Sequence, residues 1–354
     1  MLAVEVPAPA AEEVRRELHR LGLVDPSRKM TKRDGRVLIP VKGPPPLEAS
    51  RHGGRVVDGG VLEARDRPRD PREVLAERLA AEGLPRDASP RRWERLGDVV
   101  VLRVPSIARE RARDLGRVVG EVLHARTVVE DVSGVHGPFR TPDVRVLWGD
   151  GTETEHVEDG IRFRLDVAKI MFSSGNLAER TSLAARVRPS EVVVDLFAGI
   201  GYFAIPVAVR ARPSRVYACE ANPAAFAYLE ANIRRNRASN VVPLRGDCRE
   251  TAPAGVAEWV LMGHFDAPRY LDVAVRALRD EGRILVHGLF PREDVPGRAE
   301  AEVAAAARSA GADVLEARAR VVKSYAPSIR HAVVELRARR GPKGLSGRGP
   351  SGPP

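Results

Sequence analysis

The stretch Glu191-Val-Val-Val-Asp-Leu-Phe-Ala-Gly-Ile-Gly201 decides the fold of this 354-residue chain. Its β-branched residues predict a short strand that is buried on both faces. Gly199 and Gly201 predict a sharp turn in which the backbone approaches a ligand closely, because neither residue carries a Cβ atom. A helix is expected from about Tyr202. The alternative is that the two glycines only make a tight connection between the strand and the helix.

A second predicted strand, residues 215–219, ends in Glu220 about twenty residues after the turn, as in nucleotide-binding βαβ units whose acid holds the ribose hydroxyls. The turn lacks a third glycine at dinucleotide spacing, and no Gly-Lys-Ser/Thr follows it. Asp247 follows the third predicted strand, where it could bind an adenine amino group. Acids after the second and third strands predict S-adenosylmethionine, a nucleoside that carries a positive sulfonium and no phosphate.

The composition is that of an ordinary globular protein with more than one domain, with 43% hydrophobic and 30% charged residues. A net charge of +10 favours a polyanionic partner such as nucleic acid. Cys219 and Cys248 are the only cysteines, so we expect no disulfide and no metal site, and a cytoplasmic location. No signal peptide is expected. Asp195 and Pro206 interrupt the longest apolar stretch, which argues against a membrane span.

The patterns predict three domains and a tail. Residues 1–66 form a small α/β domain whose basic segment, residues 27–36, is a candidate RNA-phosphate contact; a solvated hairpin is the alternative. Residues 70–165 form an α+β middle domain. Residues 166–338 alternate strands and helices, which predicts an α/β, Rossmann-like domain with a doubly wound sheet. Residues 339–354 are rich in glycine, proline and basic residues, and we expect them to be disordered.

Within the Rossmann-like domain, strands are expected near residues 191–197, 215–219, 240–245, 258–262 and 282–288. Helices are expected near residues 177–187, 202–211, 223–236, 267–280 and 297–310. Two further strands, residues 312–322 and 331–337, complete the predicted core.

Two stretches carry a resemblance to a known family. Val167-Ala-Lys-Ile-Met-Phe-Ser-Ser-Gly-Asn-Leu-Ala-Glu-Arg180, followed by Asp195-Leu-Phe-Ala-Gly-Ile-Gly201, resembles the archaeal group of tRNA anticodon-loop modifying enzymes. One branch of that group contains the tRNA guanine-N1 methyltransferases, and the other contains the wybutosine-pathway 3-amino-3-carboxypropyl transferases. Looser matches in residues 28–41, 96–101 and 133–140 extend the resemblance over most of the chain. The first of these resembles the family's N-terminal tRNA-binding domain.

The resemblance implies a class I S-adenosylmethionine-dependent transferase that acts on tRNA without a metal. It assigns these residues to the cofactor: Ser173, Arg180, Gly199, Glu220, Asp247 and Cys248. Ser173 and Arg180 would line the methionine end, where a guanidinium group suits the carboxylate of the donor. Glu220 would hold the ribose, and Asp247 with the backbone of Cys248 would frame the adenine. The alternative for Arg180 is a surface ion pair.

The residues after the fourth predicted strand indicate the branch. The methyltransferase branch has an Asn-Leu-Pro type motif at this place, whereas this chain has Met262-Gly263-His264-Phe265. Met-Gly followed by an aromatic residue is typical of the transferase branch, which residues 322–336 also resemble; here His264 replaces that aromatic residue. His264 is also a candidate base, because imidazole titrates near neutrality. A structural loop histidine is the alternative.

We therefore expect transfer of the 3-amino-3-carboxypropyl group from S-adenosyl-L-methionine to C7 of 4-demethylwyosine at position 37 of tRNA(Phe), with release of methylthioadenosine. The sulfonium activates three carbons, and the carbon that reacts is the one held in line with the nucleophile. Methylation of guanine N1 at the same nucleotide is the first alternative, and an inactive tRNA-binding protein is the second. The expected partner is the anticodon loop, with neither a membrane nor an obligate protein partner.

Overall fold

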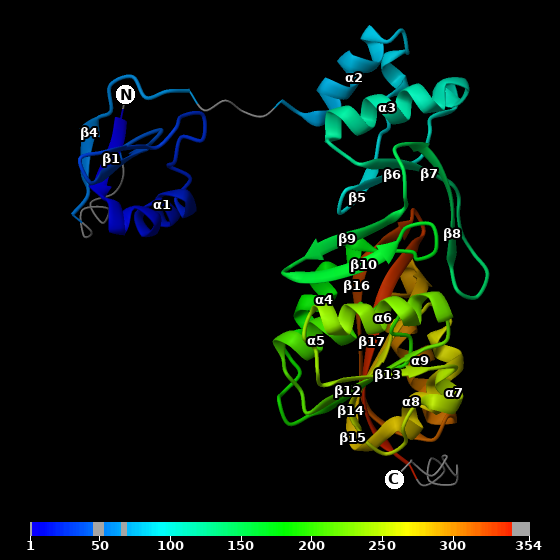
Figure 1. Ribbon diagram of the computed structural model, residues 1–354. Coiled ribbons are helices and arrows are strands. Elements are labelled where there is room, and N and C mark those ends of the chain that lie inside the picture. Colours follow the sequence, from blue (N-terminus) through cyan, green and yellow to red (C-terminus); the bar gives the residue numbers. More distant parts are fainter. Residues whose placement is uncertain (1, 45–52, 65–68, 342–354) are drawn as a thin grey trace. The chain divides into compact units, whose positions relative to one another are not determined.

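The computed structural model describes residues 2–44, 53–64 and 69–341 (Figure 1). These residues separate into two compact units, Met1–Val74 and Leu75–Pro354. Within the described ranges, no helix combines the length and the apolar character that a membrane span requires.

The first unit is a four-stranded antiparallel sheet with one helix packed on it. The order of its strands is β2-β3-β1-β4. Helix α1, Ala11–Arg20, buries Val14 and Leu18 against Val4 and Ile39 of the sheet. The sequence patterns did not predict β1, although it lies inside the sheet and pairs with both β3 and β4. The strands are β1 (Leu2–Pro7), β2 (Thr31–Arg33), β3 (Arg36–Pro40) and β4 (Arg55–Asp58).

The second unit begins with a four-stranded sheet in the order β5-β6-β7-β8, in which β6 and β7 run parallel and the other pairs run antiparallel. Two helices bury Leu75, Leu79 and Leu115 against this sheet. A separate antiparallel hairpin, β9-β10, follows. The elements are α2 (Pro71–Ala81), β5 (Trp93–Leu96), β6 (Val99–Leu102), α3 (Ala112–Leu123), β7 (Thr127–His136), β8 (Thr141–Trp148), β9 (Glu153–Glu158) and β10 (Ile161–Asp166).

A seven-stranded sheet in the order β13-β12-β11-β14-β15-β17-β16 forms the rest of the second unit. Strands β11 to β15 run parallel, whereas β17 runs antiparallel to both of its neighbours. This confirms the predicted α/β Rossmann-like class. The strands are β11 (Val192–Asp195), β12 (Arg215–Glu220), β13 (Val241–Arg245), β14 (Ala257–Met262), β15 (Leu278–Pro291), β16 (Ala312–Ala326) and β17 (Ile329–Arg340).

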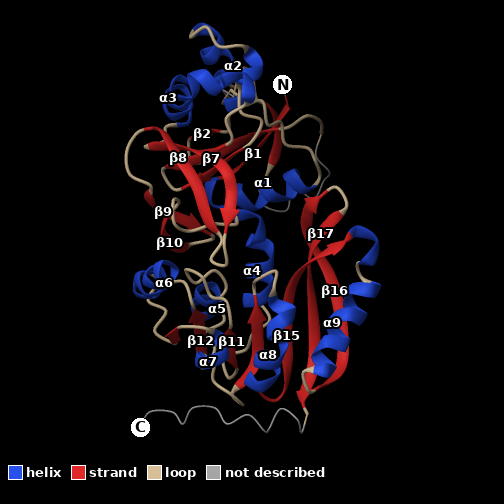
Figure 2. Cartoon of the chain, turned by 90° about the vertical axis from the view of Figure 1, so that its right-hand side faces the viewer, coloured by secondary structure: helices blue, strands red, loops and turns tan. Residues whose placement is uncertain are grey.

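Helices cover both faces of this sheet (Figure 2). Because side chains alternate along a strand, Val193 and Trp259 pack in the core formed with α4, α5 and α6, whereas Val194 and Val260 pack in the core formed with α8 and α9. Because both faces are buried, the sequences of these strands are nearly continuous runs of apolar residues. The helices are α4 (Leu177–Ala184), α5 (Ala204–Arg210), α6 (Pro223–Arg235), α7 (Cys248–Thr251), α8 (Leu271–Ala277) and α9 (Gly297–Ser309).

Several element boundaries differ from the prediction. The helix predicted to residue 280 ends at Ala277, and β15 starts at Leu278. Strand β17 continues to Arg340, so the start of the predicted tail is ordered sheet; residues 342–354 lie outside the described residues. The division predicted between residues 165 and 166 stays a prediction. A single apolar core crosses it, since Val99 and Val129 belong to the same cluster as Val193.

Candidate active site

The predicted glycine turn lies at the carboxyl end of β11, between the ends of β12 and β14. The amide of Leu196 donates to the carbonyl of Leu261 at 2.9 Å, which ties the turn to the end of β14. Gly199 and Gly201 have φ angles of +59° and +98°. A Cβ on Gly201 would lie 2.4 Å from Cδ1 of Ile205, so only glycine fits here. The carboxyl edge of such a sheet is where ligands bind in doubly wound folds.

Glu220 ends β12, and its carboxylate holds the turn in place. The amide of Gly199 donates to one oxygen at 2.7 Å, and the amide of Asn222 donates to the other at 2.7 Å. Burial raises the pKa of Glu220, and the backbone amides of Asn222, Gly199 and Ala221 oppose that rise. A carboxylate has about four acceptor positions, so two remain for the hydroxyls of a ligand. The predicted ribose contact is therefore compatible with the geometry.

Asp195 is a candidate site residue to which the sequence patterns assigned no role. It is fully buried at the end of β11, and its Oδ1 accepts the amide of Phe197 at 3.2 Å. Its Oδ2 is buried and has no hydrogen-bond partner among the residues that the structure describes. Burial, with a smaller contribution from Glu220, raises its pKa to about 7. An unsatisfied buried carboxylate oxygen is rare in proteins, and it would suit the ammonium group of a bound donor.

Asp247 and Cys248 lie where β13 turns into α7. Asp247 accepts the amide of Arg249 at 2.9 Å and pairs with the Arg249 guanidinium, with Nη2 and Oδ2 2.5 Å apart. That hydrogen bond lowers the pKa of Asp247. An adenine amino group would therefore share this carboxylate with Arg249. Burial raises the pKa of the Cys248 thiol to about 12, so it is not a thiolate at neutral pH.

His264 lies near the residues that follow β13. Its ring stacks on Phe197, with centroids 5.5 Å apart and planes at 29°. Phe197 in turn contacts Tyr270, over which the guanidinium of Arg249 lies. Burial lowers the pKa of His264, and its Nδ1 already accepts a backbone amide at 3.1 Å. Through this series of ring contacts, the structure places His264 near Arg249, the partner of Asp247, at the carboxyl edge of the sheet.

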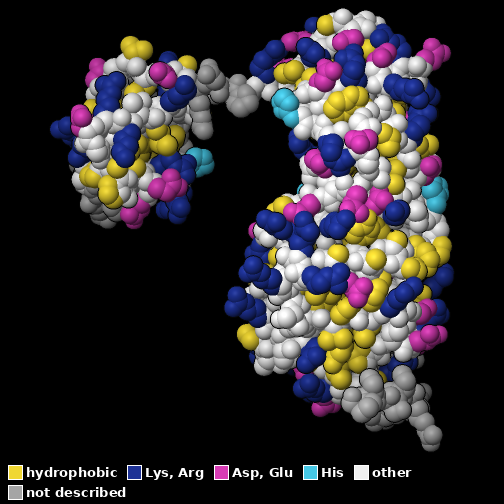
Figure 3. Space-filling model, in the orientation of Figure 1, with side chains coloured by type: hydrophobic (Ala, Val, Ile, Leu, Met, Phe, Trp, Pro, Cys, Tyr) yellow, Lys and Arg dark blue, Asp and Glu magenta, His cyan; other side chains and the backbone are white. Residues whose placement is uncertain are grey.

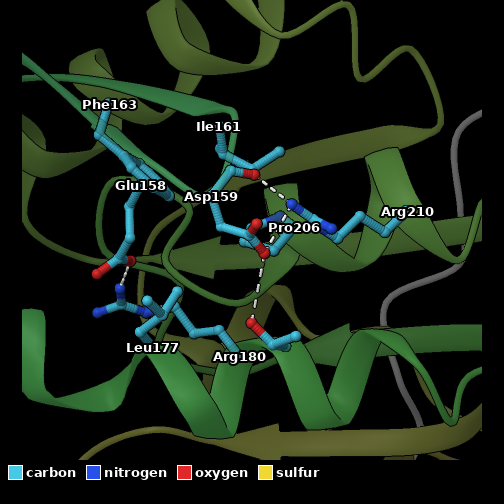
Figure 4. A pocket seen from close by; sticks show the side chains of 9 residues that line it. Glu158, Asp159, Ile161, Phe163, Leu177, Arg180, Pro206 and Arg210 are labelled. Atoms are coloured by element: carbon cyan, nitrogen blue, oxygen red, sulfur yellow. Dashed lines mark hydrogen bonds and ion pairs between the residues drawn. The ribbon is translucent and has the colours of Figure 1, made fainter. Parts of the chain in front are cut away.

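Ser173 and Arg180 meet at the start of α4. Arg180 donates to the carbonyl oxygen of Ser173 at 2.6 Å and forms an ion pair with Glu158, which is buried as well (Figure 4). Its guanidinium also lies over the rings of Phe172 and Tyr202. Burial lowers its pKa to about 10, so it remains charged at neutral pH. Protein groups enclose this guanidinium, so a surface ion pair is excluded. Its predicted contact with the donor carboxylate stays a prediction.

A small hollow lies beside this ion pair, between α4, α5 and the β9-β10 turn (Figure 4). Its volume is about 10 Å³, which is room for about one water molecule. Arg210 crosses one side of it and pairs with Asp159 at 2.7 Å. The hollow is too small for a nucleoside, so the cofactor cannot occupy it.

Lys323 on β16 joins Ser173 and Arg180, and the sequence patterns did not single it out as a site residue. Its Nζ donates to Oγ of Ser173 at 3.0 Å. It also lies against Gly175, where an added Cβ would stand 2.9 Å from Nζ. Burial lowers the pKa of Lys323, with Glu94 opposing the shift. A cation beside a serine hydroxyl is a second candidate partner for the donor carboxylate.

A Rossmann-like sheet with a glycine turn at its carboxyl edge and an acid after its second strand is a nucleotide-binding arrangement, and it is the arrangement of the class I S-adenosylmethionine-dependent transferases. Three family models match the chain: the TRM5/TYW2 methyltransferase domain over residues 154–315, the TYW2 N-terminal domain over residues 72–152 and the tRNA methyltransferase 5 N-terminal domain over residues 3–47. The chain belongs to the TRM5/TYW2 family.

Its relatives include members of both branches. The tRNA(Phe) (4-demethylwyosine(37)-C(7)) aminocarboxypropyltransferase of Methanocaldococcus jannaschii is 37% identical over 250 residues, 70% of this chain and 98% of that protein. The tRNA (guanine(37)-N(1))-methyltransferase Trm5b of Pyrococcus abyssi is 33% identical over 345 residues, 95% of this chain and 98% of that protein. The crystal structure of P. horikoshii TYW2 in complex with MeSAdo superposes with a TM-score of 0.68 at 32% identity, covering 76% of this chain and all of that one.

Proposed function

We propose that this protein transfers the 3-amino-3-carboxypropyl group from S-adenosyl-L-methionine to C7 of 4-demethylwyosine at position 37 of tRNA(Phe). The observation that carries this function is the match to the M. jannaschii aminocarboxypropyltransferase over 98% of that protein. Two local features agree with it. Residues 72–152 match the TYW2 N-terminal domain, and Met262-Gly263-His264-Phe265 replaces the Asn-Leu-Pro motif expected of a methyltransferase.

The side chains at the carboxyl edge fit such a donor. In the proposed complex, Glu220 binds the ribose hydroxyls, Asp195 faces the donor ammonium group, and Lys323 with Ser173 faces its carboxylate. The reaction forms a bond between C7 and the γ-carbon of the donor and breaks the bond from that carbon to sulfur, whose electron pair leaves with methylthioadenosine. The ring proton of C7 is released. This step requires no covalent nucleophile on the protein, so positioning supplies most of the catalysis.

Methylation of guanine N1 is the second candidate. The observation in its favour is that the matches to methyltransferases include the N-terminal domain. The Trm5b relative matches 95% of this chain, and residues 3–47 match the tRNA methyltransferase 5 N-terminal domain. The M. jannaschii and P. horikoshii aminocarboxypropyltransferases match only 70% and 75% of the chain. The residues around the reacting carbon decide the chemistry, whereas the N-terminal unit serves the binding of tRNA. We therefore rank aminocarboxypropyl transfer first.

Donor labelled separately in the methyl carbon and in the carboxypropyl carbons tests the two functions. We expect carboxypropyl label to enter tRNA(Phe) that carries 4-demethylwyosine, with methylthioadenosine as the second product. Methyl label entering tRNA with unmodified guanosine at the same position would instead establish methylation. A protein that binds tRNA but incorporates neither label, and that shows no S-adenosylmethionine binding by calorimetry, would be an inactive tRNA-binding protein.

The N-terminal unit is expected to supply part of the tRNA affinity. Lys32 and Arg33 are exposed on the β2-β3 hairpin, within the predicted basic segment. Deleting residues 1–69 should weaken tRNA binding and reduce its dependence on salt. The slope of the logarithm of the binding constant against the logarithm of the salt concentration should become less steep by about 0.7–0.9 for each phosphate that the protein no longer neutralises. The affinity for S-adenosylmethionine should stay the same. Filter binding of tRNA(Phe) at several salt concentrations measures the first effect, and calorimetry measures the second.

Point variants sharpen this experiment. Lys32→Ala combined with Arg33→Ala should reproduce part of the loss. Arg16→Ala, which removes an exposed charge from α1 that pairs with Glu12, is the matched control. If the deletion leaves tRNA affinity and salt slope as in the full chain, the N-terminal unit does not bind tRNA. The spread of Lys and Arg over the visible surface agrees with an electrostatic contribution (Figure 3). We propose the anticodon loop as the tRNA element and the cytoplasm as the location.

A further inference from the structure

Two histidines form a buried pair at the carboxyl edge of the seven-stranded sheet. His287 on β15 is 3% exposed, His331 on β17 is 1% exposed, and Nδ1 of His287 lies 3.0 Å from Nε2 of His331. The other ring nitrogen of His331, Nδ1, is buried and has no hydrogen-bond partner among the residues that the structure describes. Burial lowers the pKa of His287 to about 3 and that of His331 to about 4. Both rings are therefore neutral near pH 7.

The pair lies between the glycine turn and the loop that distinguishes the two branches. β17 runs antiparallel to β15, so its first residues lie beside the last residues of β15. Phe203, which follows the turn, has its ring centroid 5.3 Å from that of His287. Phe265, in the loop after β14, has its ring centroid 5.1 Å from that of His331, with the planes at 75°. The reacting carbon of a donor bound at the turn would face this region.

Aromatic side chains cover His331 on the outer side. Phe265 is partly exposed, and its ring lies 5.7 Å from that of Tyr325, which is 54% exposed. The guanidinium of Arg140 lies over Phe265 at 5.1 Å. Exposed aromatic rings and an arginine plane are the groups on which unpaired bases stack. A flat tricyclic base that stacks here and displaces the Phe265 ring would lie against the imidazole ring of His331.

We propose that His331 accepts the C7 proton of the acceptor base and that His287 is its positioning residue; this inference rests on the proposed function. In the required tautomer, Nε2–H of His331 donates to Nδ1 of His287, which leaves a lone pair on Nδ1 of His331. C7 bonds to the γ-carbon of the donor as the bond from that carbon to sulfur breaks, and methylthioadenosine leaves with the electron pair of the broken bond on its sulfur. The C7–H electrons return to the ring as the proton moves to Nδ1.

The surroundings suit a base that releases its proton again. Lys323 on β16 lowers the pKa of His331, and Arg320 on β16 lowers that of His287. Burial first, and these cations in addition, keep the pair neutral before the reaction and favour loss of the proton to water afterwards. His264 is the less suitable base, because its ring stacks on Phe197 and its Nδ1 already accepts an amide.

His331→Asn and His331→Ala test the proposal in the full chain, with tRNA(Phe) carrying 4-demethylwyosine with either hydrogen or deuterium at C7. We expect kcat to fall about 100-fold, as for loss of a general base, with dissociation constants for donor and tRNA within twofold of wild type. A deuterium isotope effect that wild type lacks should appear, because proton removal becomes the slow step. Added imidazole should restore part of the activity of His331→Ala.

His124→Asn is the matched control, because His124 is exposed and has φ of +50°, a conformation that asparagine adopts well. It should retain wild-type kcat. Wild-type kcat in His331→Asn would overturn the role of His331, and so would a loss of activity with neither an isotope effect nor rescue by imidazole. Both results leave carboxypropyl transfer by the wild type intact. Wild type that incorporates no carboxypropyl label would overturn the proposed function and this inference together.

Discussion

Glu220→Ala is expected to weaken binding of S-adenosylmethionine by about 100-fold or more. The proposed complex has two ribose hydroxyls on this carboxylate, and each hydrogen bond to a charged group contributes about 1.5–3 kcal/mol. Two bonds at the lower end amount to about 3 kcal/mol, and every 1.4 kcal/mol is about tenfold in affinity. Titration calorimetry with S-adenosylmethionine and with methylthioadenosine measures the effect. Both ligands should lose affinity alike, because both carry the ribose.

Two further variants separate this contact from the shape of the turn. Glu220 also accepts the amides of Gly199 and Asn222, so the alanine variant is expected to lower the melting temperature as well. Glu220→Gln keeps one acceptor oxygen in the same place and should lose about tenfold in affinity, the contribution of one charged hydrogen bond. Glu250→Ala, at an exposed acid on α7, is the control. Unchanged affinity in Glu220→Ala would show that the ribose lies elsewhere.

Binding of S-adenosylmethionine is expected to tighten as the pH rises from 5 towards 7. The pKa of Asp195 in the free protein is about 7, so most of its side chains are protonated below that pH. A donor ammonium group favours the carboxylate, so binding releases a proton and affinity rises by up to about tenfold per pH unit. Above about pH 8 the amino group of the donor itself loses its proton, and the gain should stop.

Asp195→Asn should weaken binding at pH 7 and flatten this pH dependence. Glu220, whose pKa is also raised, accounts for any slope that remains. Asp195 also affects the stability of the fold, but there the protonated side chain is the favoured form, whereas donor binding favours the carboxylate. Because its folded pKa exceeds the unfolded value of 3.8, its stabilising effect is fully present below pH 3.8 and is lost as the pH rises through about 7. Calorimetry and thermal unfolding between pH 5 and 8 measure both effects. If the affinity of Asp195→Asn for S-adenosylmethionine depends on pH as steeply as that of wild type, Asp195 does not contact the donor.

Local patterns predicted the nucleotide end of the candidate site because each signal lies within a few residues of the chain. The branched run at Val192 to Val194 is buried on both faces, and the glycines have the positive φ angles that the turn requires. Glu220 and Asp247 are residues at or just beyond the ends of parallel strands, and such ends meet at one edge of a sheet. Sequence reasoning also identified the TRM5/TYW2 family and its cofactor.

Pairings between distant strands limited the prediction of elements. Residues 278–280 were predicted as the end of a helix, because Leu278 and Arg279 are good helix formers. In the structure they start β15, where Glu281 pairs with Arg337 and Arg339 of β17. Strand β1 was missed because its six residues include a charge and end in proline. It is stable through its pairing on both sides, which no local pattern records.

The sequence by itself determined the class of fold, the family and the donor, and it predicted the glycine turn as the donor site, because strand pattern, glycine spacing and terminal acids act over short stretches. Only the tertiary structure decided which side chains surround the candidate site residues. It encloses Arg180 with Glu158, brings Lys323 to Ser173 across 150 residues, and joins His287 to His331. The pairing of the two histidines follows from the adjacency of β15 and β17 in the sheet, and the other two contacts join elements that are distant in the sequence.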